Sequence, residues 1–250
     1  MPHAKRTFGG VLGGLLGLVG LSAIAGILVT ATVTPAIAVS GYAASSAISL
    51  FDSLPGNLQI DRPMEPTTIY AQKGDGSGEY YELASFYDQN REPVEYNQVS
   101  PYVYDALLST EDPRFFEHGG VDLIGTGRAL LSNAVSESTQ GGSSISQQYV
   151  KGVQLQVCER TAANEEELAD CAYDASTAEG TAGYQRKLQE MRYAITIEQE
   201  YSKEQILIGY LNLVNFGGST YGIEAAAQYY FNTTAKDLTL SQAATLVGIV

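Results

Sequence analysis

The feature that constrains this chain most is an uncharged stretch near its N-terminus. After Lys5 and Arg6 no charged residue occurs before Asp52, and Phe8 to Val33 is almost entirely Gly, Ala, Leu, Val and Ile. About 20 apolar residues let a helix span a bilayer, and this stretch is longer. Its glycines would weaken a helix in water but are common in membrane helices. We therefore predict one transmembrane anchor over residues 8–34.

The flanking charges predict how this anchor is oriented. Because Lys5 and Arg6 precede it, the positive-inside rule keeps residues 1–7 in the cytoplasm and places the rest of the chain outside. The alternative is a cleaved signal peptide, with Ala36-Ile37-Ala38 as its cleavage site. Apolar cores of signal peptides usually run only ~7–15 residues, so the length favours an uncleaved anchor.

The charge balance limits the possible partners. The chain has 28 acidic and 14 basic residues, a net charge of -14. Such a chain repels the phosphates of nucleic acid, so no nucleic-acid partner is expected. Charge alone would not hold it on anionic lipid either. An anionic ligand must therefore be bound by a local cluster of Lys and Arg.

The remaining residues are predicted to form one domain after a linker. Of the 250 residues 44% are hydrophobic, enough for one ordinary domain with its own core. Residues 35–66 are the expected juxtamembrane linker, and residues 67–250 the domain. The apolar pattern at Val250 carries no helix C-cap signal. A longer parent protein is therefore expected.

Hydrophobic periodicity predicts a mainly helical domain that begins with two strands. The strands are expected over 67–70 and 80–86, separated by the glycine-rich turn 74–78. Helix signals follow, including Pro101 after Ser100, and Ser202 with Gln205 three residues later. The predicted helices are 102–108, 121–134, 143–150, 184–200, 203–213, 223–230 and 240–250.

Residues 152–183 are predicted to be an exposed insertion, because they are rich in acidic and small residues. Both cysteines, Cys158 and Cys171, lie in this segment. Outside the cytoplasm a disulfide between them is expected, and two unpaired surface thiols are the alternative. No CxxC or Cys/His cluster indicates zinc.

The first cluster that could carry chemistry runs from Glu111 to Gly119. It joins the adjacent carboxylates of Glu111 and Asp112 to two phenylalanines and to His118. A carboxylate beside aromatic rings can act as a general base. Taken alone, solvated charges at a helix end explain the cluster more simply.

The second cluster is a Gly141-Gly142 turn followed by hydroxyl residues at a helix start. Backbone N–H groups at a helix N-terminus suit an anion. Gln148 and Lys151 are three residues apart and share a helix face. No Gly-Lys-Ser/Thr follows, so this is not a Walker loop. A capped helix with a polar face explains the pattern equally well.

Two further clusters lie in the second half of the domain. Arg186 and Glu190 are four residues apart, as in an ordinary surface ion pair. The segment Tyr210-Leu211-Asn212 and the small-residue run 221–231 are expected to be mostly core.

Together, in this order and behind an anchor, the four clusters resemble the family 51 peptidoglycan glycosyltransferases. These enzymes occur as the first catalytic module of class A penicillin-binding proteins and as single-module enzymes. The resemblance covers about Thr67 to Val250. The matching residues are Glu111, Asp112, Phe115, His118, Gly119, Gly142, Ser143, Gln147, Gln148, Lys151, Arg186, Lys187, Glu190, Tyr210, Leu211, Asn212, Tyr221, Gly222, Ala226 and Ala227.

The chain departs from the family pattern at several positions. Ser144 stands for a usual Thr, Gly152 for Asn, Gly209 for Glu and Asn232 for Gly. Ala182 stands where the family has an arginine that helps bind pyrophosphate. The insertion over 152–183 is longer than usual.

The resemblance implies a mainly α, lysozyme-like domain with a small membrane-facing subdomain. It also implies an extracytoplasmic enzyme that polymerises lipid II into glycan strands by inverting β-1,4 transfer, releasing polyprenyl pyrophosphate. Glu111 is then the expected base, and Glu190 a second catalytic residue. The implied substrate-binding residues are Asp112, His118, Ser143, Ser144, Gln147, Gln148, Lys151, Arg186 and Lys187.

The implied partners are lipid II, the growing lipid-linked glycan, the bacterial cell membrane and other cell-wall synthesis proteins. No cofactor is certain, and a divalent metal (Mg²⁺ or Mn²⁺) at Glu190 stays open. No Ser-x-x-Lys or Lys-Thr-Gly occurs, so any transpeptidase module follows Val250 in the parent protein. A glycan hydrolase and a non-catalytic scaffold are the alternatives. Lys151 and Arg186 count against the hydrolase, and the intact Glu111 and Glu190 against the scaffold.

Overall fold

The computed structural model describes residues 22, 45, 48–49, 51–135, 141–177 and 180–250. The chain divides into two compact units, Met1–Leu54 and Pro55–Val250. The predicted anchor, 8–34, lies outside the described residues except for Ser22. Within the described ranges no helix combines the length and apolarity that a membrane crossing requires. The anchor therefore stays a prediction.

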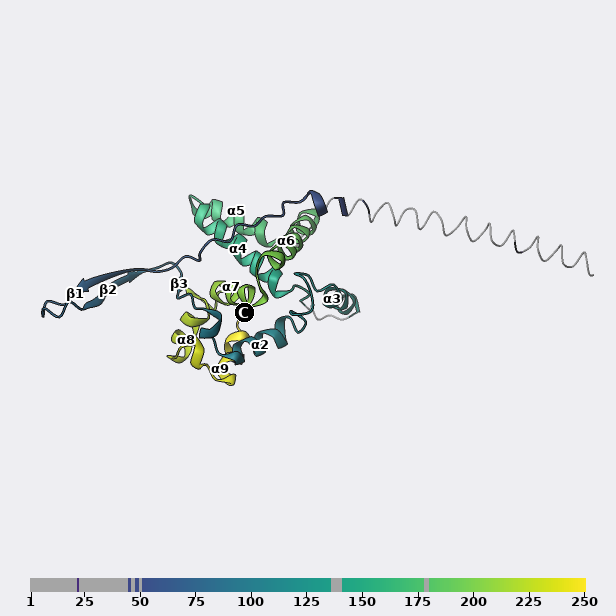
Figure 1. Cartoon of the computed structure of the whole chain (residues 1–250). Helices are drawn as coiled ribbons and strands as arrows, with labels where there is room; N and C mark the ends of the chain where they lie inside the picture. Colours follow the sequence, from purple (N-terminus) through teal and green to yellow (C-terminus); the bar gives the residue numbers. More distant parts are fainter. Residues whose placement is uncertain (1–21, 23–44, 46–47, 50, 136–140, 178–179) are drawn as a thin grey trace, which may run out of the picture. The chain divides into compact units, whose positions relative to one another are not determined.

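The second unit is mainly helical, as expected, with two small sheets (Figure 1). Its strands are β1 (Thr67–Gln72), β2 (Tyr80–Phe86), β3 (Asn90–Arg91) and β4 (Thr220–Tyr221). Its helices are η1 (Tyr96–Gln98), α2 (Pro101–Glu111), α3 (Leu123–Val135), α4 (Ile145–Thr161), α5 (Glu165–Ser176), α6 (Gly180–Glu200), α7 (Lys203–Leu213), α8 (Ile223–Phe231), η2 (Ala235–Asp237) and α9 (Leu240–Val247).

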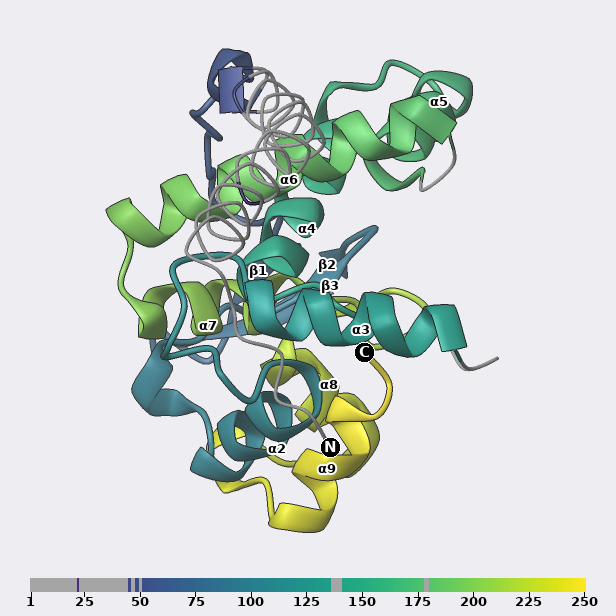
Figure 2. The same cartoon turned by 90° about the vertical axis from the view of Figure 1, so that its right-hand side faces the viewer.

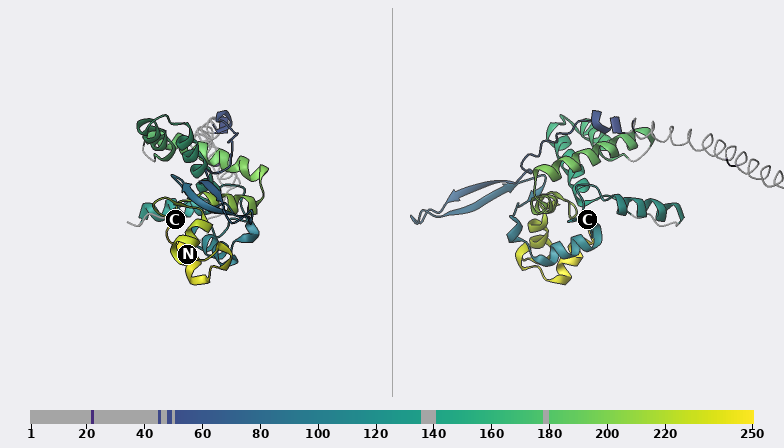
Figure 3. Two further views of the ribbon diagram at one scale, coloured as in Figure 1. Left: turned by 90° about the vertical axis from the view of Figure 1, so that its left-hand side faces the viewer. Right: turned by 45° about the vertical axis from the view of Figure 1, so that its right-hand side comes forward.

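The two predicted strands are present as β1, which extends to Gln72, and β2, whereas β3 and β4 were not predicted. β1 and β2 pair antiparallel, with Thr67 opposite Phe86 and Gln72 opposite Tyr80, and form a two-stranded ribbon of their own (Figure 3). The short β3 and β4 pair in parallel, with Asn90 opposite Thr220. This second pair joins the start of the domain to the segment after α7.

The helices form two groups on either side of α7 (Figure 2). On one side α4 packs against α5 and α6, and on the other α2 packs against α9, and α9 against α8. α7 contacts α4, α6 and α8. It can do so because its apolar residues recur at helical spacing and are buried: Ile206, Leu207, Tyr210 and Leu211. The core is thus continuous across both groups.

Two glycines let α4 and α7 approach closely. A Cβ atom on Gly152 would lie 2.7 Å from Cδ2 of Leu213, and one on Gly209 would lie 2.7 Å from the ring of Tyr149. Both distances are shorter than real Cβ contacts allow. Gly152 and Gly209 are two of the departures from the family pattern, and they lie in the same helix–helix interface. The two departures therefore have one structural explanation.

Capping agrees in part with the prediction. Ser202 accepts from the backbone N–H of Gln205 and closes the predicted capping box. Pro101 occupies the first turn of α2, as predicted, but the Ser100 hydroxyl makes no cap hydrogen bond. It donates instead to the carbonyl of Leu238 at 2.8 Å.

The prediction that 152–183 is an exposed insertion is wrong for its first part. α4 continues to Thr161, and Val153, Gln156 and Cys158 are buried on it. The acidic and small residues suggested an irregular surface segment, but these buried side chains show that the helix packs against the rest of the domain beyond Gly152. The exposed part is α5, which has no buried residue. Cys158 on α4 and Cys171 on α5 form a disulfide with an S–S distance of 1.97 Å.

Candidate active site

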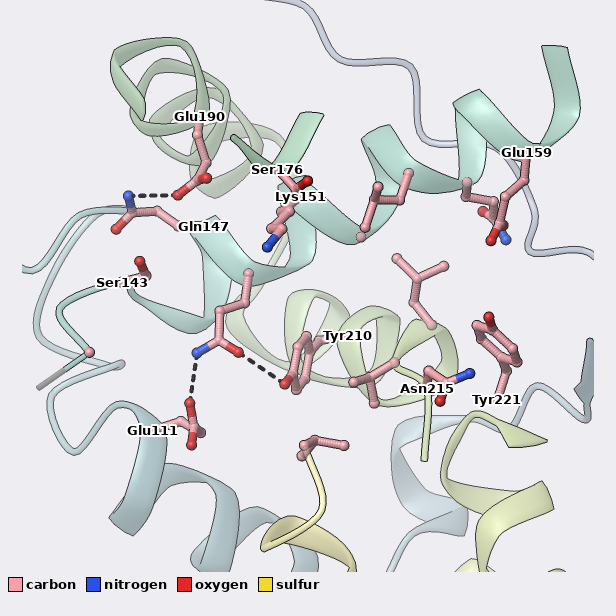
Figure 4. A pocket seen from close by; sticks show the side chains of 18 of the residues that line it. Glu111, Ser143, Gln147, Lys151, Glu159, Ser176, Glu190, Tyr210, Asn215 and Tyr221 are labelled. Carbon is pink, nitrogen blue, oxygen red and sulfur yellow. Dashed lines mark hydrogen bonds between the residues drawn. The ribbon is translucent and has the colours of Figure 1, made fainter. Parts of the chain in front are cut away.

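A cavity of about 760 Å³ runs along one face of α4 (Figure 4). The α4 residues that line it are spaced three and four apart, which places them on a single helix face. They are Gln147, Gln148, Lys151, Gly152, Leu155, Gln156 and Glu159. α2, α6 and α7 supply the facing side chains, which include Glu111, Arg186, Lys187, Glu190 and Tyr210.

Eight of the residues predicted as site residues line this one cavity: Glu111, Ser143, Gln147, Gln148, Lys151, Arg186, Lys187 and Glu190. Three clusters separated in the sequence therefore meet in space, around α4.

Glu111, the last residue of α2, lies at one end of the cavity. Its Oε2 accepts from Nε2 of Gln148 at 2.8 Å, and Oε1 of Gln148 accepts from the hydroxyl of Tyr210 at 3.0 Å. Figure 4 shows these two hydrogen bonds, which link α2 to α4 and α4 to α7. Burial, aided by the negative charge of Glu111, raises the pKa of Tyr210 above its usual value. Tyr210 therefore stays a donor, and this holds the Gln148 amide with its NH₂ toward Glu111.

Glu190 on α6 lies at another end in different surroundings. The residue as a whole is only 2% exposed. One oxygen accepts from Nη1 of Arg186 at 2.6 Å, and the other accepts from Nζ of Lys187 and from Nε2 of Gln147 at 3.1 Å. Such burial of a charge is tolerable because cations and hydrogen bonds surround it. The predicted Arg186–Glu190 pair is thus not a solvated surface pair.

The cavity concentrates positive charge within an acidic protein. Its lining includes four cationic side chains, those of Arg91, Lys151, Arg186 and Lys187, against three carboxylates, those of Glu111, Glu159 and Glu190. Lys187 also donates to the hydroxyl of Ser143 at 2.6 Å. Nζ of Lys151 makes no hydrogen bond or ion pair with any residue that the structure describes. This is the local cation cluster that the net charge of -14 requires for an anionic ligand.

Three residues that were expected to bind substrate do not line the cavity: Asp112, His118 and Ser144. Asp112 accepts from the N–H of Ile145 at 3.1 Å and pairs with Nε2 of His118 at 2.9 Å. Ser144 donates to the carbonyl of Gly120 at 2.5 Å and caps α4. The carboxylate of Asp112, Nε2 of His118 and the hydroxyl of Ser144 are thus occupied within the protein, and they attach the loop after α2 to the start of α4. Nδ1 of His118 is buried without a hydrogen-bond partner among the described residues.

At the N-terminus of α4, where an anion site was expected, backbone N–H groups already bond to side chains of the protein. The N–H of Ile145 bonds Asp112, that of Gln147 bonds the Ser144 hydroxyl, and that of Ser144 bonds Oε1 of Gln147. A carboxylate already complements the positive end of the helix dipole there. Three of the N–H groups expected to hold an anion are therefore already bonded within the protein.

The sequence interpretation missed Arg91. Its guanidinium donates to the carbonyls of Met64 at 2.9 Å and Leu213 at 3.3 Å, and lies 5.0 Å from the ring centroid of Tyr221. Burial lowers the pKa of Arg91 from its usual value. Its position depends on contacts with distant segments, and no motif surrounds it. Tyr210 was expected in the core, and only the fold reveals its hydroxyl contact.

Glu190 does not fit a divalent metal in this arrangement. Both of its oxygens already accept from cationic side chains, which would repel Mg²⁺ or Mn²⁺. Across the residues that the structure places, no three His, Cys, Asp or Glu side chains form a group that could hold a metal ion.

The transglycosylase family model matches residues 79–250. The chain is 38% identical over 182 residues to penicillin-binding protein 1F of Bacillus subtilis (strain 168), an alignment covering 72% of this chain and 21% of that protein. It is 35% identical over 212 residues to penicillin-binding protein 1A of Neisseria gonorrhoeae, covering 84% and 23%.

The chain therefore spans only 21% and 23% of the length of these two relatives. The family match, by contrast, covers most of the helical unit and all eight cavity-lining site residues. The chain belongs to the transglycosylase family, the family 51 peptidoglycan glycosyltransferases found in class A penicillin-binding proteins.

Proposed function

We propose that this domain polymerises lipid II into peptidoglycan glycan strands by inverting β-1,4 glycosyl transfer. One observation carries the proposal: the carboxylate of Glu111 and the cations Lys151, Arg186 and Lys187 line the same cavity. A sugar hydroxyl that attacks an anomeric carbon needs a base, and a departing pyrophosphate needs positive charge. The cavity supplies both.

Glu111 is the proposed general base. Oε2 accepts from the Gln148 amide, whereas Oε1 accepts no hydrogen bond from the described residues. Oε1 can therefore take the proton of the acceptor hydroxyl as its oxygen bonds to the anomeric carbon. The bond between that carbon and the pyrophosphate oxygen breaks, and its electron pair leaves with the pyrophosphate.

Lys151, Arg186 and Lys187 are the proposed contacts of the leaving group. Charge that develops on pyrophosphate is stabilised best by cations that are already in position. Glu190 holds two of them, Arg186 and Lys187, through its oxygens. We assign Glu190 to positioning these cations.

A position at the outer face of the cell membrane is part of the proposal. Residues 8–34 would anchor the chain, and the lipid-linked substrates lie in the same bilayer. On α3 the side chains of Leu123 and Ile124 are 78% and 73% exposed, which supports a membrane-facing subdomain. N-terminal sequencing of membrane-extracted protein tests the anchor. A mature N-terminus near Val39 would replace it with a cleaved signal peptide.

The direct test is incubation of the purified protein with labelled lipid II. We expect polymer on a gel and release of polyprenyl pyrophosphate, both lost in the Glu111→Gln variant. Preformed glycan added to the same protein should keep its length. Shortening of that glycan without polymer formation would favour the hydrolase instead.

A further inference from the structure

We infer that helix α5, tied to α4 by the Cys158–Cys171 disulfide, positions Arg186 for the reaction. The inference rests on the proposed function, and it gives a role to the segment by which this chain departs most from the family pattern. It rests on three observations: the place of the disulfide on α4, the few other contacts of α5, and the hydrogen bond at the end of α5.

The disulfide lies on α4 away from the cavity face. Leu155, Gln156 and Glu159 line the cavity. Cys158 does not line it and is 3% exposed. Its bond to Cys171 therefore joins α5 to the helix that carries Gln147, Gln148 and Lys151. The disulfide is thus a side-chain cross-link between α5 and the cavity helix, in addition to the backbone between Thr161 and Glu165.

Little else holds α5 in place. None of its twelve residues is buried, and its main packing partner among the described elements is α4. Its start is stabilised locally, by the Asn164 cap and by Glu165, Glu166 and Glu167 in the first turn. A helix of this length is marginal in water without tertiary contacts. The disulfide is therefore its principal tertiary tie.

The C-terminus of α5 reaches the site. Ser176 lines the cavity, and Thr177 closes the helix through its N–H bond to the carbonyl of Tyr173 at 2.7 Å. The carbonyl of Thr177 accepts from Nε of Arg186 at 2.6 Å. Carbonyls at a helix C-terminus carry partial negative charge and favour a cation. Arg186 thus meets the end of α5 as a capping cation.

The guanidinium of Arg186 donates hydrogen bonds from two of its nitrogens. Nε bonds Thr177, and Nη1 bonds Glu190 at 2.6 Å. An arginine has five N–H donors, so others remain for an anion. Without α5 only the pair with Glu190, four residues along the same helix, would orient the guanidinium. A lysine at position 186 lacks the planar guanidinium that contacts Thr177 and Glu190 in this geometry.

The test compares the oxidised wild-type domain with its Cys158→Ser/Cys171→Ser variant and with wild type reduced by dithiothreitol. We expect kcat/KM for polymerisation to fall roughly tenfold in both, as for one lost hydrogen bond to a charged group. Amide exchange at Arg186 to Glu190 should accelerate. Dithiothreitol should not affect the double variant further, and Asp170→Asn, an exposed α5 substitution outside the first turn, should keep the wild-type rate. If the double variant fails to fold, the reduced wild type carries the test.

A double-mutant cycle separates positioning from general structure. In an Arg186→Lys background, removal of the disulfide should cost little more, because the residue that α5 holds is already changed. Independent effects that multiply would overturn the inference, as would a folded double variant with the wild-type rate. If oxidised wild type makes no polymer, the proposed function fails instead. The exchange rate at Arg186 then still reports whether α5 restrains it.

Discussion

Glu111 and Glu190, two of the carboxylates that line the cavity, lie in opposite surroundings. Glu111 is half-buried and is held by a neutral amide, itself oriented by Tyr210. Glu190 is buried, and its oxygens accept from two cations and an amide. Oε1 of Glu111 is therefore available to accept a proton, whereas both carboxylate oxygens of Glu190 already accept hydrogen bonds. The same residue type is thus suited to proton transfer at one end and to positioning cations at the other.

The strongest test of this contrast is Glu111→Gln. The amide keeps the size of the side chain but cannot take the proton, so kcat should fall ~10²–10⁴-fold. The Kd of a non-reactive donor analogue should be unchanged. Glu117→Gln, an exposed carboxylate six residues away, is the control and should be fully active. A near wild-type rate for Glu111→Gln would contradict the base assignment.

Glu190→Gln should damage binding and stability together. The variant leaves Arg186 and Lys187 without a counter-charge, and we expect kcat/KM to fall about 100-fold as the cations lose their alignment. Loss of a buried partner should also lower the free energy of unfolding by about 2 kcal/mol, less than for fully buried pairs because Lys187 is 31% exposed. Thermal unfolding and donor-analogue binding measure both effects. A loss confined to kcat would instead indicate an acid–base role.

Lys151→Ala should reduce activity without reducing stability. Nζ of Lys151 has no protein partner within the described ranges, so its removal leaves no buried group unpaired. A charge-assisted hydrogen bond to pyrophosphate is worth about 2 kcal/mol, or roughly 30-fold in kcat/KM. The control is Lys73→Ala on the β1–β2 turn, which should keep the full rate. A marked drop in melting temperature for Lys151→Ala would show that the residue has a structural role.

Tyr210→Phe should have the smallest effect. It removes one neutral hydrogen bond, so kcat should fall about fivefold as Gln148 loses its orientation. Because the folded-state pKa of Tyr210 is raised, its contribution to stability is present below pH 10 and is lost as the pH rises further. Urea midpoints between pH 8 and 11 should therefore decline less steeply in the variant. The decline should persist, since burial also raises the pKa of Tyr149, to about 12.

Much of the site could be predicted because its local geometry follows from helical spacing. The three-residue interval between Gln148 and Lys151 placed both on one face of α4, and both line the cavity. The four-residue interval between Arg186 and Glu190 predicted their ion pair, which the structure contains. The sequence did not reveal that this pair is buried, because its burial depends on the packing of α4 against α6.

The errors have a common cause. The composition of residues 152–183 suggested an exposed insertion, but contacts with the rest of the domain extended α4 through its first part. The N–H groups at the start of α4 looked free for phosphate, but Asp112, 33 residues away, already accepts one of them. A local sequence pattern shows which groups could bind a ligand. It does not show whether a residue distant in the sequence already forms a hydrogen bond with those groups.

The sequence by itself determined the family, the helical domain, the pairings within a single helix turn and the residues that carry charge. The helices and the pairings depend on neighbours within a few positions along the chain, where backbone geometry sets the distances. The family follows from the order of four motifs along the chain. Tertiary structure alone decided the contacts between distant segments: Gln148 with Glu111, Gln147 with Glu190, and Thr177 with Arg186. Those contacts form only when separate helices pack, because the free energy of burying their apolar faces, and not the polar pattern, brings the helices together.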